Sequence, residues 1–176
     1  NLLQHYQSGR YGDAEKLAVS ITQEFPKHQF AWEILGAIFE QTGRNVAAAN
    51  ARESAVALFP QDAKAHYNLG TTLQDMGRLD EAEACYKQAI TLKSDFAKAH
   101  SNLGITLQAL GRLDEAELSY REAIAFKPDY AAAHNNLGNT LKELGRLDGA
   151  EASYKQAIAI KSNYAEAHNN LGNTLR

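Results

Sequence analysis

Side-chain amides recur along this sequence at a constant interval, and they are the first candidates for a binding function. The interval is 34 residues, and the residues that mark it are Asn68, Asn102, Asn136 and Asn170. A primary amide offers both a hydrogen-bond donor and an acceptor, and the backbone of an extended peptide presents the same two groups. The row therefore predicts non-covalent recognition of a peptide. The alternative role is to bridge adjacent helices, and the two roles can coexist.

Histidines recur at the same interval, at His66, His100, His134 and His168. A zinc site would need several of them to converge on one ion at about 2 Å each. Equivalent residues of stacked helical repeats are instead separated by about 10 Å. We therefore expect the histidines to have packing roles, and we expect no metal site and no cofactor.

No set of residues in the sequence is typical of catalysis. Cys85 is the only cysteine, and no histidine-and-carboxylate arrangement accompanies it, so we expect an inert thiol. The sequence has no glycine-rich phosphate loop, nucleophile elbow or paired acid–base motif. These observations predict a protein that is not an enzyme and has no catalytic residue.

The composition disfavours other classes of partner. The chain has 18 basic and 21 acidic residues and a net charge of −3, so no basic excess favours nucleic acid. No apolar stretch approaches the ~20 residues of a transmembrane helix, so no membrane insertion is expected. A single cysteine cannot form an internal disulfide. That fits a reducing compartment and makes the cytoplasm the expected location.

Helical hairpins are the elements that must position these side chains, because further residues share the interval. Within residues 63–96, Ala65, Leu69 and Leu73 recur at the steps of an amphipathic helix, and a second such stripe starts at Leu79. Gly77 lies between the stripes, where glycine can adopt the left-handed conformation of a turn. Three series repeat this arrangement along the chain: Gly36, Gly70, Gly104, Gly138 and Gly172; Gly9, Gly43, Gly77, Gly111 and Gly145; and Ala14, Ala48, Ala82, Ala116 and Ala150.

The interval divides the chain into one array of repeats. It predicts a partial hairpin at residues 1–28, full repeats at 29–62, 63–96, 97–130 and 131–164, and a lone first helix at 165–176. Asp95, Asp129 and Asn163 are expected to cap the first helices that follow them. The terminal helices would expose apolar residues such as Leu171 and Leu175, which favours self-association through those helices.

The repeat resembles that of the tetratricopeptide repeat family. One copy carries the family pattern as Trp32, Leu35-Gly36, Phe39, Ala48, Ala55 and Pro60, and the next copy as Leu69-Gly70, Leu73, Ala82, Tyr86 and Ala89. The resemblance implies an all-α fold, a right-handed superhelical α-solenoid of antiparallel helix hairpins. Two positions depart from the pattern. Histidines replace Trp32 in the later repeats, and Arg52 stands where the later repeats have tyrosine.

The resemblance also implies where a partner would bind, since the first helices of such arrays line a concave face. The amide row is similar to the asparagine ladder of O-GlcNAc transferase-like proteins. The candidate peptide-binding groove consists of Lys64, Tyr67, Asn68, Thr71, Gln74, Lys98, Ser101, Asn102, Gln108, Asn135, Asn136, Asn139, Lys142, Asn169, Asn170 and Asn173. A carboxylate clamp, a second binding mode of the family, is disfavoured because asparagine recurs where that clamp needs arginine.

Together these features predict a non-enzymatic interaction scaffold that binds a protein or peptide segment in an asparagine-rich concave groove. Two alternatives stay open. One is the N-terminal substrate-recognition array of a larger enzyme, similar to a glycosyltransferase or a sulfotransferase. The other is a scaffold that self-assembles by end-to-end stacking.

Overall fold

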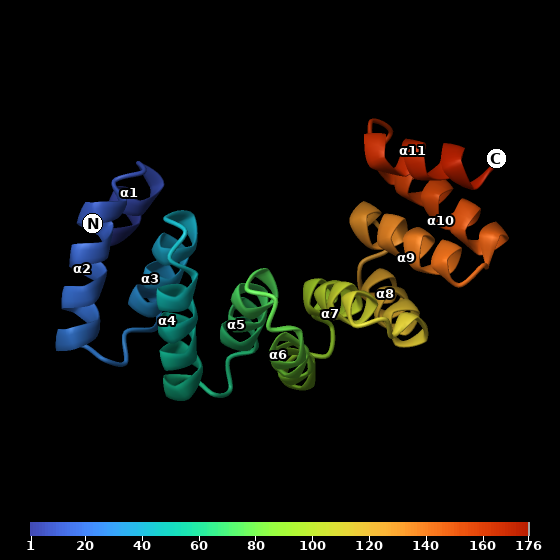
Figure 1. The fold of residues 1–176 in the computed structure, drawn as a ribbon. Coiled ribbons are helices and arrows are strands. Elements are labelled where there is room, and N and C mark those ends of the chain that lie inside the picture. The colour runs from blue at the N-terminus through green and yellow to red at the C-terminus, as the bar shows by residue number, and fades with distance from the viewer. Residues whose placement is uncertain (176) are drawn as a thin grey trace. The chain divides into compact units, whose positions relative to one another are not determined.

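The fold is built from helices alone over residues 1–175, the part of the chain that the computed structural model describes (Figure 1). Short loops join the helices. They are α1 (Leu2–Gln7), α2 (Tyr11–Glu24), α3 (Gln29–Gln41), α4 (Asn45–Leu58), α5 (Ala63–Asp75), α6 (Leu79–Leu92), α7 (Ala97–Ala109), α8 (Leu113–Phe126), α9 (Ala131–Glu143), α10 (Leu147–Ile160) and α11 (Ala165–Thr174). The all-α fold of helix hairpins expected from the sequence is confirmed.

The chain forms two compact units, Asn1–Leu92 and Lys93–Arg176. In the first unit, α3 packs on α4 and α5 on α6, and α4 also contacts α5. In the second unit, α7 packs on α8 and α9 on α10, while α8 contacts α9 and α10 contacts α11. Each unit is therefore a stack in which a hairpin covers the apolar faces of its neighbour. The repeat boundaries drawn from the sequence stay a prediction.

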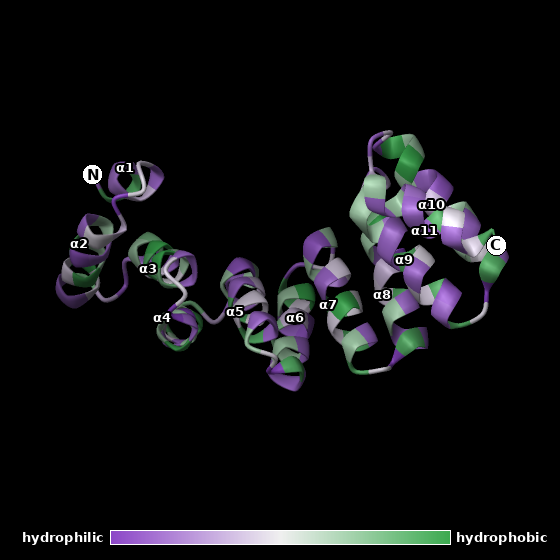
Figure 2. Cartoon of the chain, turned by 45° about the horizontal axis from the view of Figure 1, so that its top comes forward, coloured by the Kyte–Doolittle hydropathy of each residue, from purple (hydrophilic) through white to green (hydrophobic). Residues whose placement is uncertain are grey.

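Close contact between a glycine and a tyrosine ring joins the two helices of the α5–α6, α7–α8 and α9–α10 hairpins. The helices are amphipathic, with hydrophobic and hydrophilic residues on different faces (Figure 2). In the second unit, Tyr120 and Tyr154 are fully buried. A Cβ atom on Gly104 or Gly138 would lie only 2.7 or 2.6 Å from the nearest carbon of these rings. Glycine is thus required where the ring lies flat on the first helix.

Glycine also makes the turn inside each hairpin. Gly111, between α7 and α8, has a φ of +75°, a conformation that other residues rarely adopt. Its N–H donates to the Gln108 carbonyl at 2.9 Å, and the Arg112 N–H donates to the Leu107 carbonyl at 2.9 Å. These bonds satisfy carbonyl groups at the end of α7 and reverse the chain into α8.

The expected capping of the first helices by Asp95, Asp129 and Asn163 is wrong. The N-cap residues in the second unit are Phe96, Tyr130 and Tyr164, and their side chains make no capping hydrogen bond. Each ring instead lies under the ammonium group of a lysine three residues earlier, at 5.5, 5.0 and 5.0 Å for Lys93, Lys127 and Lys161. The aspartate or asparagine therefore lies one residue before the N-cap, and each helix begins one residue later than expected.

Candidate functional site

The predicted groove residues all lie on the first helices of the hairpins. Most of them are exposed or half-buried, but the side chains of Ser101 and Asn135 are only 2% and 0% exposed. In the first unit the set lies on α5, as Lys64, Tyr67, Asn68, Thr71 and Gln74. In the second unit it lies on α7, α9 and α11, as Lys98, Ser101, Asn102, Gln108, Asn135, Asn136, Asn139, Lys142, Asn169, Asn170 and Asn173.

Several of the asparagines bridge adjacent helices, which is the role that the sequence left open beside ligand contact. The Asn170 amide on α11 donates to the side-chain oxygens of Asn135 at 3.1 Å and Asn139 at 3.0 Å, both on α9. Asn135 in turn donates to Glu166 at 2.9 Å, and the Tyr154 hydroxyl donates to Asn139 at 2.8 Å. These side chains stabilise the end of the second unit.

Asn68 and Asn136 differ from that network. Both are half-buried on a first helix, and neither side-chain amide makes a hydrogen bond with any residue among 1–175. The two asparagines occupy the same repeat position, one in each compact unit. Neither residue has a side-chain polar atom that is both buried and unsatisfied, so the two amides are accessible to water or to a ligand.

The glutamines of the predicted groove hold the buried tyrosines in place. The Tyr86 hydroxyl donates to Gln74 at 2.7 Å and the Tyr120 hydroxyl to Gln108 at 3.3 Å. Burial raises the pKa of Tyr120 well above its usual range, so the phenol stays a neutral donor. The glutamine oxygens therefore accept hydrogen bonds within the protein.

The lysines of the predicted groove differ in their pairing. Lys64 forms an ion pair with Glu33 at 2.7 Å. Lys98 and Lys142 form no ion pair with any described residue, and Lys98 is exposed at the start of α7. A positive charge without a carboxylate partner is therefore available on α7 and on α9.

The recurring histidines serve the packing role expected for them. The Nε2 atoms of His66, His100, His134 and His168 lie 3.0, 2.8, 3.0 and 2.9 Å from the backbone carbonyl six residues earlier. A carbonyl oxygen can only accept, so each ring donates an Nε2–H. Trp32 makes the same bond from its indole N–H at 2.8 Å, which explains why histidine can replace it. Over residues 1–175, no group of three or more metal-ligating side chains comes together.

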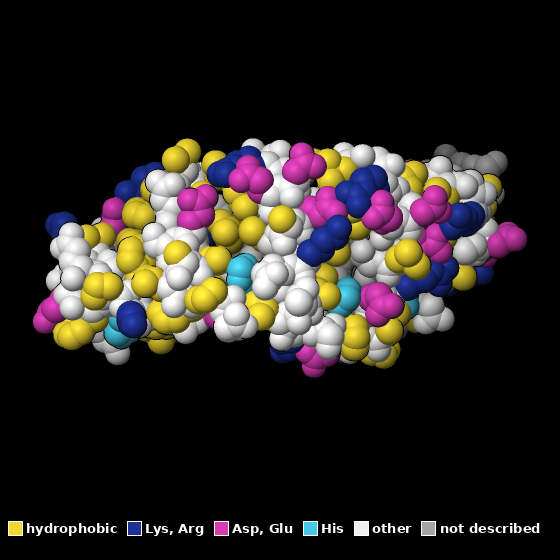
Figure 3. Space-filling view, turned by 90° about the horizontal axis from the view of Figure 1, so that it is seen from below, with side chains coloured by type: hydrophobic (Ala, Val, Ile, Leu, Met, Phe, Trp, Pro, Cys, Tyr) yellow, Lys and Arg dark blue, Asp and Glu magenta, His cyan; other side chains and the backbone are white. Residues whose placement is uncertain are grey.

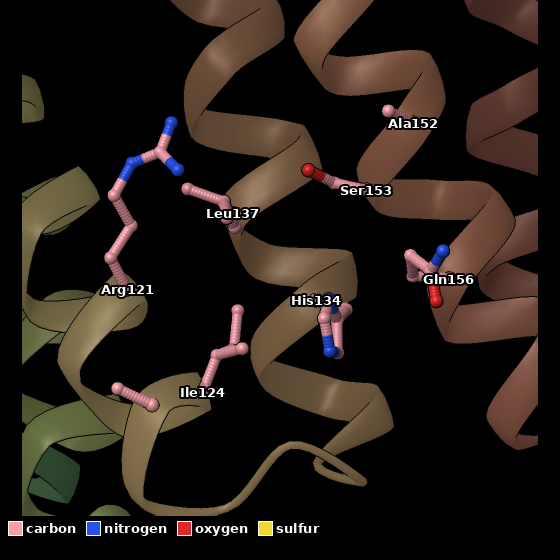
Figure 4. Close-up of a pocket in the computed structure, with 8 residues that line it drawn as sticks. Arg121, Ile124, His134, Leu137, Ala152, Ser153 and Gln156 are labelled. Atoms are coloured by element: carbon pink, nitrogen blue, oxygen red, sulfur yellow. The ribbon is translucent and has the colours of Figure 1, made fainter.

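A small cavity is lined by residues of α8, α9 and α10. Figure 4 shows it between α8 and α10, with His134 and Leu137 at its floor. Its volume is about 380 Å³, and its walls include Ile124 and Ala152. Arg121 at the rim is paired with Glu117 at 2.8 Å. The cavity can accommodate an apolar side chain but offers few free polar groups.

The molecular surface shows no dominant charge on the face in Figure 3, where Lys and Arg side chains are interspersed with Asp and Glu. Ion pairs such as Arg44–Glu15 and Arg146–Asp114 join neighbouring hairpins within a unit, at 2.6 and 3.0 Å. None of the helices among the described residues is both long and apolar enough to cross a membrane.

Hairpins that present equivalent side chains in rows define this chain as a helical-repeat protein. It belongs to the tetratricopeptide repeat family. Family models described as tetratricopeptide repeat match residues 3–63, 61–129 and 119–152, and one described as TPR repeat matches residues 138–175. No curated protein sequence matches the chain.

Solved structures share the fold at low sequence identity. MamA superposes with a TM-score of 0.85 at 23% identity, over 93% of this chain and 95% of that chain. YrrB, described as "a TPR protein with an unusual peptide-binding site", gives 0.81 at 20% identity, over 96% and 87%. The first TPR of Spaghetti (RPAP3), bound to the HSP90 peptide SRMEEVD, gives 0.64 at 23% identity, over 65% and 91%. Identities this low establish the fold alone.

Proposed function

We propose that this protein is a non-enzymatic scaffold that binds an extended peptide segment along its first helices. The observation that carries the proposal is the pair of half-buried amides without an internal partner, Asn68 and Asn136, at one repeat position in the two units. Two structures of the same fold, those of YrrB and Spaghetti, are described with a peptide-binding site or a bound peptide. They support peptides as the class of ligand.

The chemistry of the surface fits a peptide backbone better than a fixed side-chain sequence. Each amide can donate to a backbone carbonyl and accept from a backbone N–H, and each such bond contributes about 1 kcal/mol. The exposed Asn169 and Asn173 extend the amide row on α11. Binding through them tolerates many sequences, so selectivity must come from neighbouring side chains.

Support for a non-enzymatic role comes from Cys85, the only thiol of the chain. Burial, with Glu81 nearby, raises its pKa to about 11. A thiol that remains protonated at neutral pH is a poor nucleophile. A peptide-binding array would serve equally well as the recognition part of a larger enzyme.

Self-assembly is the second candidate function, and one observation favours it. A Cβ atom on Gly172 of α11 would meet nothing within 4 Å, whereas Tyr120 and Tyr154 cover the equivalent glycines of α7 and α9. Leu175 beside it is 61% exposed.

The test is selection from a phage-displayed library of random peptides of about twelve residues, which span some 40 Å when extended. We expect enrichment on the wild-type protein. A peptide that binds the second unit should lose affinity about tenfold with Asn136→Ala, and one that binds the first unit should do so with Asn68→Ala. Ala152→Glu, in the wall of the α8–α10 cavity, is the matched control and should bind normally.

Two results would contradict the proposal. One is a selected peptide that loses affinity with Ala152→Glu but not with Asn136→Ala. The other is a failure to enrich any peptide while the mass from light scattering rises with protein concentration, since that outcome would favour self-assembly.

A further inference from the structure

We propose that Ile105 on α7 selects the ligand of the second unit, an extended peptide with an apolar side chain and an acidic residue about three positions away from it. This rests on the peptide-binding function proposed above and names its ligand class. Ile105 is half-exposed, and it is the one large apolar residue in a series whose other members are Ala37, Thr71, Asn139 and Asn173.

The first step is the reason why Asn136 has no partner. Asn170 donates to Asn135 and Asn139, which lie 35 and 31 residues earlier on the preceding first helix. The repeat places Asn136 in the same way against Ser101 and Ile105. Serine is shorter than asparagine, and isoleucine carries no polar side-chain atom, so neither forms a hydrogen bond with the Asn136 amide.

The first unit shows the same relation independently. There Ala37 on α3 occupies the position equivalent to Ile105, and it stands in the same relation to Asn68. Asn68 is also without a side-chain partner among the described residues. An apolar residue at this position therefore accompanies an unpaired amide in both units, whereas Asn139 accompanies a bonded one.

The second step concerns the side chain that a bound peptide would place here. A backbone held by Asn136 puts a neighbouring side chain against Ile105. An apolar side chain gains from burying that surface, whereas a polar one would lose its water without a hydrogen-bond partner. Ala37, which is smaller, offers less apolar surface beside Asn68. We therefore expect the preference for an apolar peptide side chain in the second unit and not in the first.

The third step is charge. Lys98 lies seven residues before Ile105 on the same face of α7, a distance of about 10 Å along the helix. Three residues of extended chain span about the same length. Lys98 is exposed and has no ion pair with any described residue, unlike Lys64 with its Glu33 partner. It is therefore free to bind a carboxylate of the peptide.

The test uses the random-peptide library on the wild type and on three variants. Ile105→Asn supplies the acceptor that Asn139 supplies to Asn170, so it should lower the affinity of the selected peptide about tenfold. Ile105→Ala leaves the amide free, as Ala37 does, and should remove only the preference for the apolar residue. Lys98→Ala should remove only the preference for the acidic one.

The Ile105→Asn variant is expected to fold, because Asn139 and Asn173 already occupy the position equivalent to Ile105 in other repeats. Circular dichroism should give the same helix content for Ile105→Asn as for the wild type. A double-mutant cycle measures the contact directly. The peptide with its apolar residue changed to alanine should lose several-fold in affinity on the wild type and almost nothing on Ile105→Ala.

The outcomes separate the two proposals. Absence of any enriched peptide, or enrichment that Asn136→Ala leaves unchanged, would reject the binding function itself. Enrichment that depends on Asn136 but shows no apolar consensus, or a cycle without coupling to Ile105, would reject only the selectivity assigned here.

Discussion

Arg52 shows how one side chain can replace another when its partner changes with it. Its guanidinium lies over Gly36, where later repeats place a tyrosine ring over glycine, and it is only 6% exposed. Nη2 donates to Glu40 at 3.0 Å. Glu40 stands at the repeat position of Gln74, which accepts from the Tyr86 hydroxyl. The pair Arg52–Glu40 therefore substitutes for the pair Tyr86–Gln74.

This exchange predicts a compensating pair of mutations. Arg52→Tyr alone should destabilise the protein by about 2 kcal/mol, because Glu40 loses its cationic partner and faces a phenol. Adding Glu40→Gln should restore most of that loss, since the amide accepts the phenol proton as Gln74 does. Urea unfolding of the two single variants and the double variant measures the coupling. Additive losses in the double variant would show that the two positions act independently.

Which asparagine side chains form hydrogen bonds within the fold could not be predicted from the sequence. The interval of 34 residues could predict that asparagines recur on equivalent first helices. Whether each amide is bonded depends on the residue that the preceding helix places against it. Asn139 accepts a hydrogen bond from the amide of Asn170, whereas no residue among 1–175 bonds to the amide of Asn136. The burial of Asn135 also depends on a neighbouring first helix, because its amide donates to Glu166 on α11.

At the scale of the helix, the sequence predicted the buried faces of the helices well and their first residues poorly. Apolar steps of three and four residues predict α5 and α6, and the buried Leu69, Leu73 and Ala82 lie on those stripes. The loops before α7, α9 and α11 form backbone turns of their own, in which the N–H groups of Phe96, Tyr130 and Tyr164 donate to the carbonyls of Lys93, Lys127 and Lys161. Propensity for capping does not include such contacts, so the predicted caps were displaced by one residue.

The approach of α7 to α8 predicts a sharp difference between two glycines of one series. Gly104→Ala should destabilise the protein by about 2 kcal/mol, because the new Cβ would lie 2.7 Å from the buried ring of Tyr120. Gly172→Ala, at the same helix position in α11, meets nothing within 4 Å. It should be neutral or stabilising by up to about 1 kcal/mol through helix propensity. Thermal melting of both variants checks the difference, and equal losses would mean that the ring does not limit the approach.

At the scale of the whole molecule, each compact unit carries a half-buried asparagine on a first helix whose side-chain amide bonds to no described residue, Asn68 in the first unit and Asn136 in the second. Near-identical hairpins thus do not give near-identical binding positions. A peptide that could bind at every repeat would slide along the array at little cost. If the proposed function holds, differences such as Ile105 against Asn139 would fix the position of the peptide, and small departures from the repeat would determine the selectivity.

Stability of the whole molecule should fall at alkaline pH. Burial raises the pKa of the Cys85 thiol to about 11 and raises the pKa values of the Tyr120, Tyr154 and Tyr164 phenols. The folded state binds these protons more tightly than the unfolded chain does. The resulting stability is therefore complete below the unfolded pKa, which is about 9 for the thiol, and is lost as pH rises through the folded value.

Urea midpoints measured from about pH 8 to about pH 11 test this dependence, because stability changes with pH only where the two states bind different numbers of protons. The midpoint of the wild type should decline over that range. Cys85→Ala removes the thiol and leaves the phenols, so its midpoint should decline less steeply. Parallel curves for the two proteins would mean that Cys85 exchanges its proton equally well in the folded and the unfolded chain. In that case its burial, and with it the argument that the thiol is unreactive at neutral pH, would have to be abandoned.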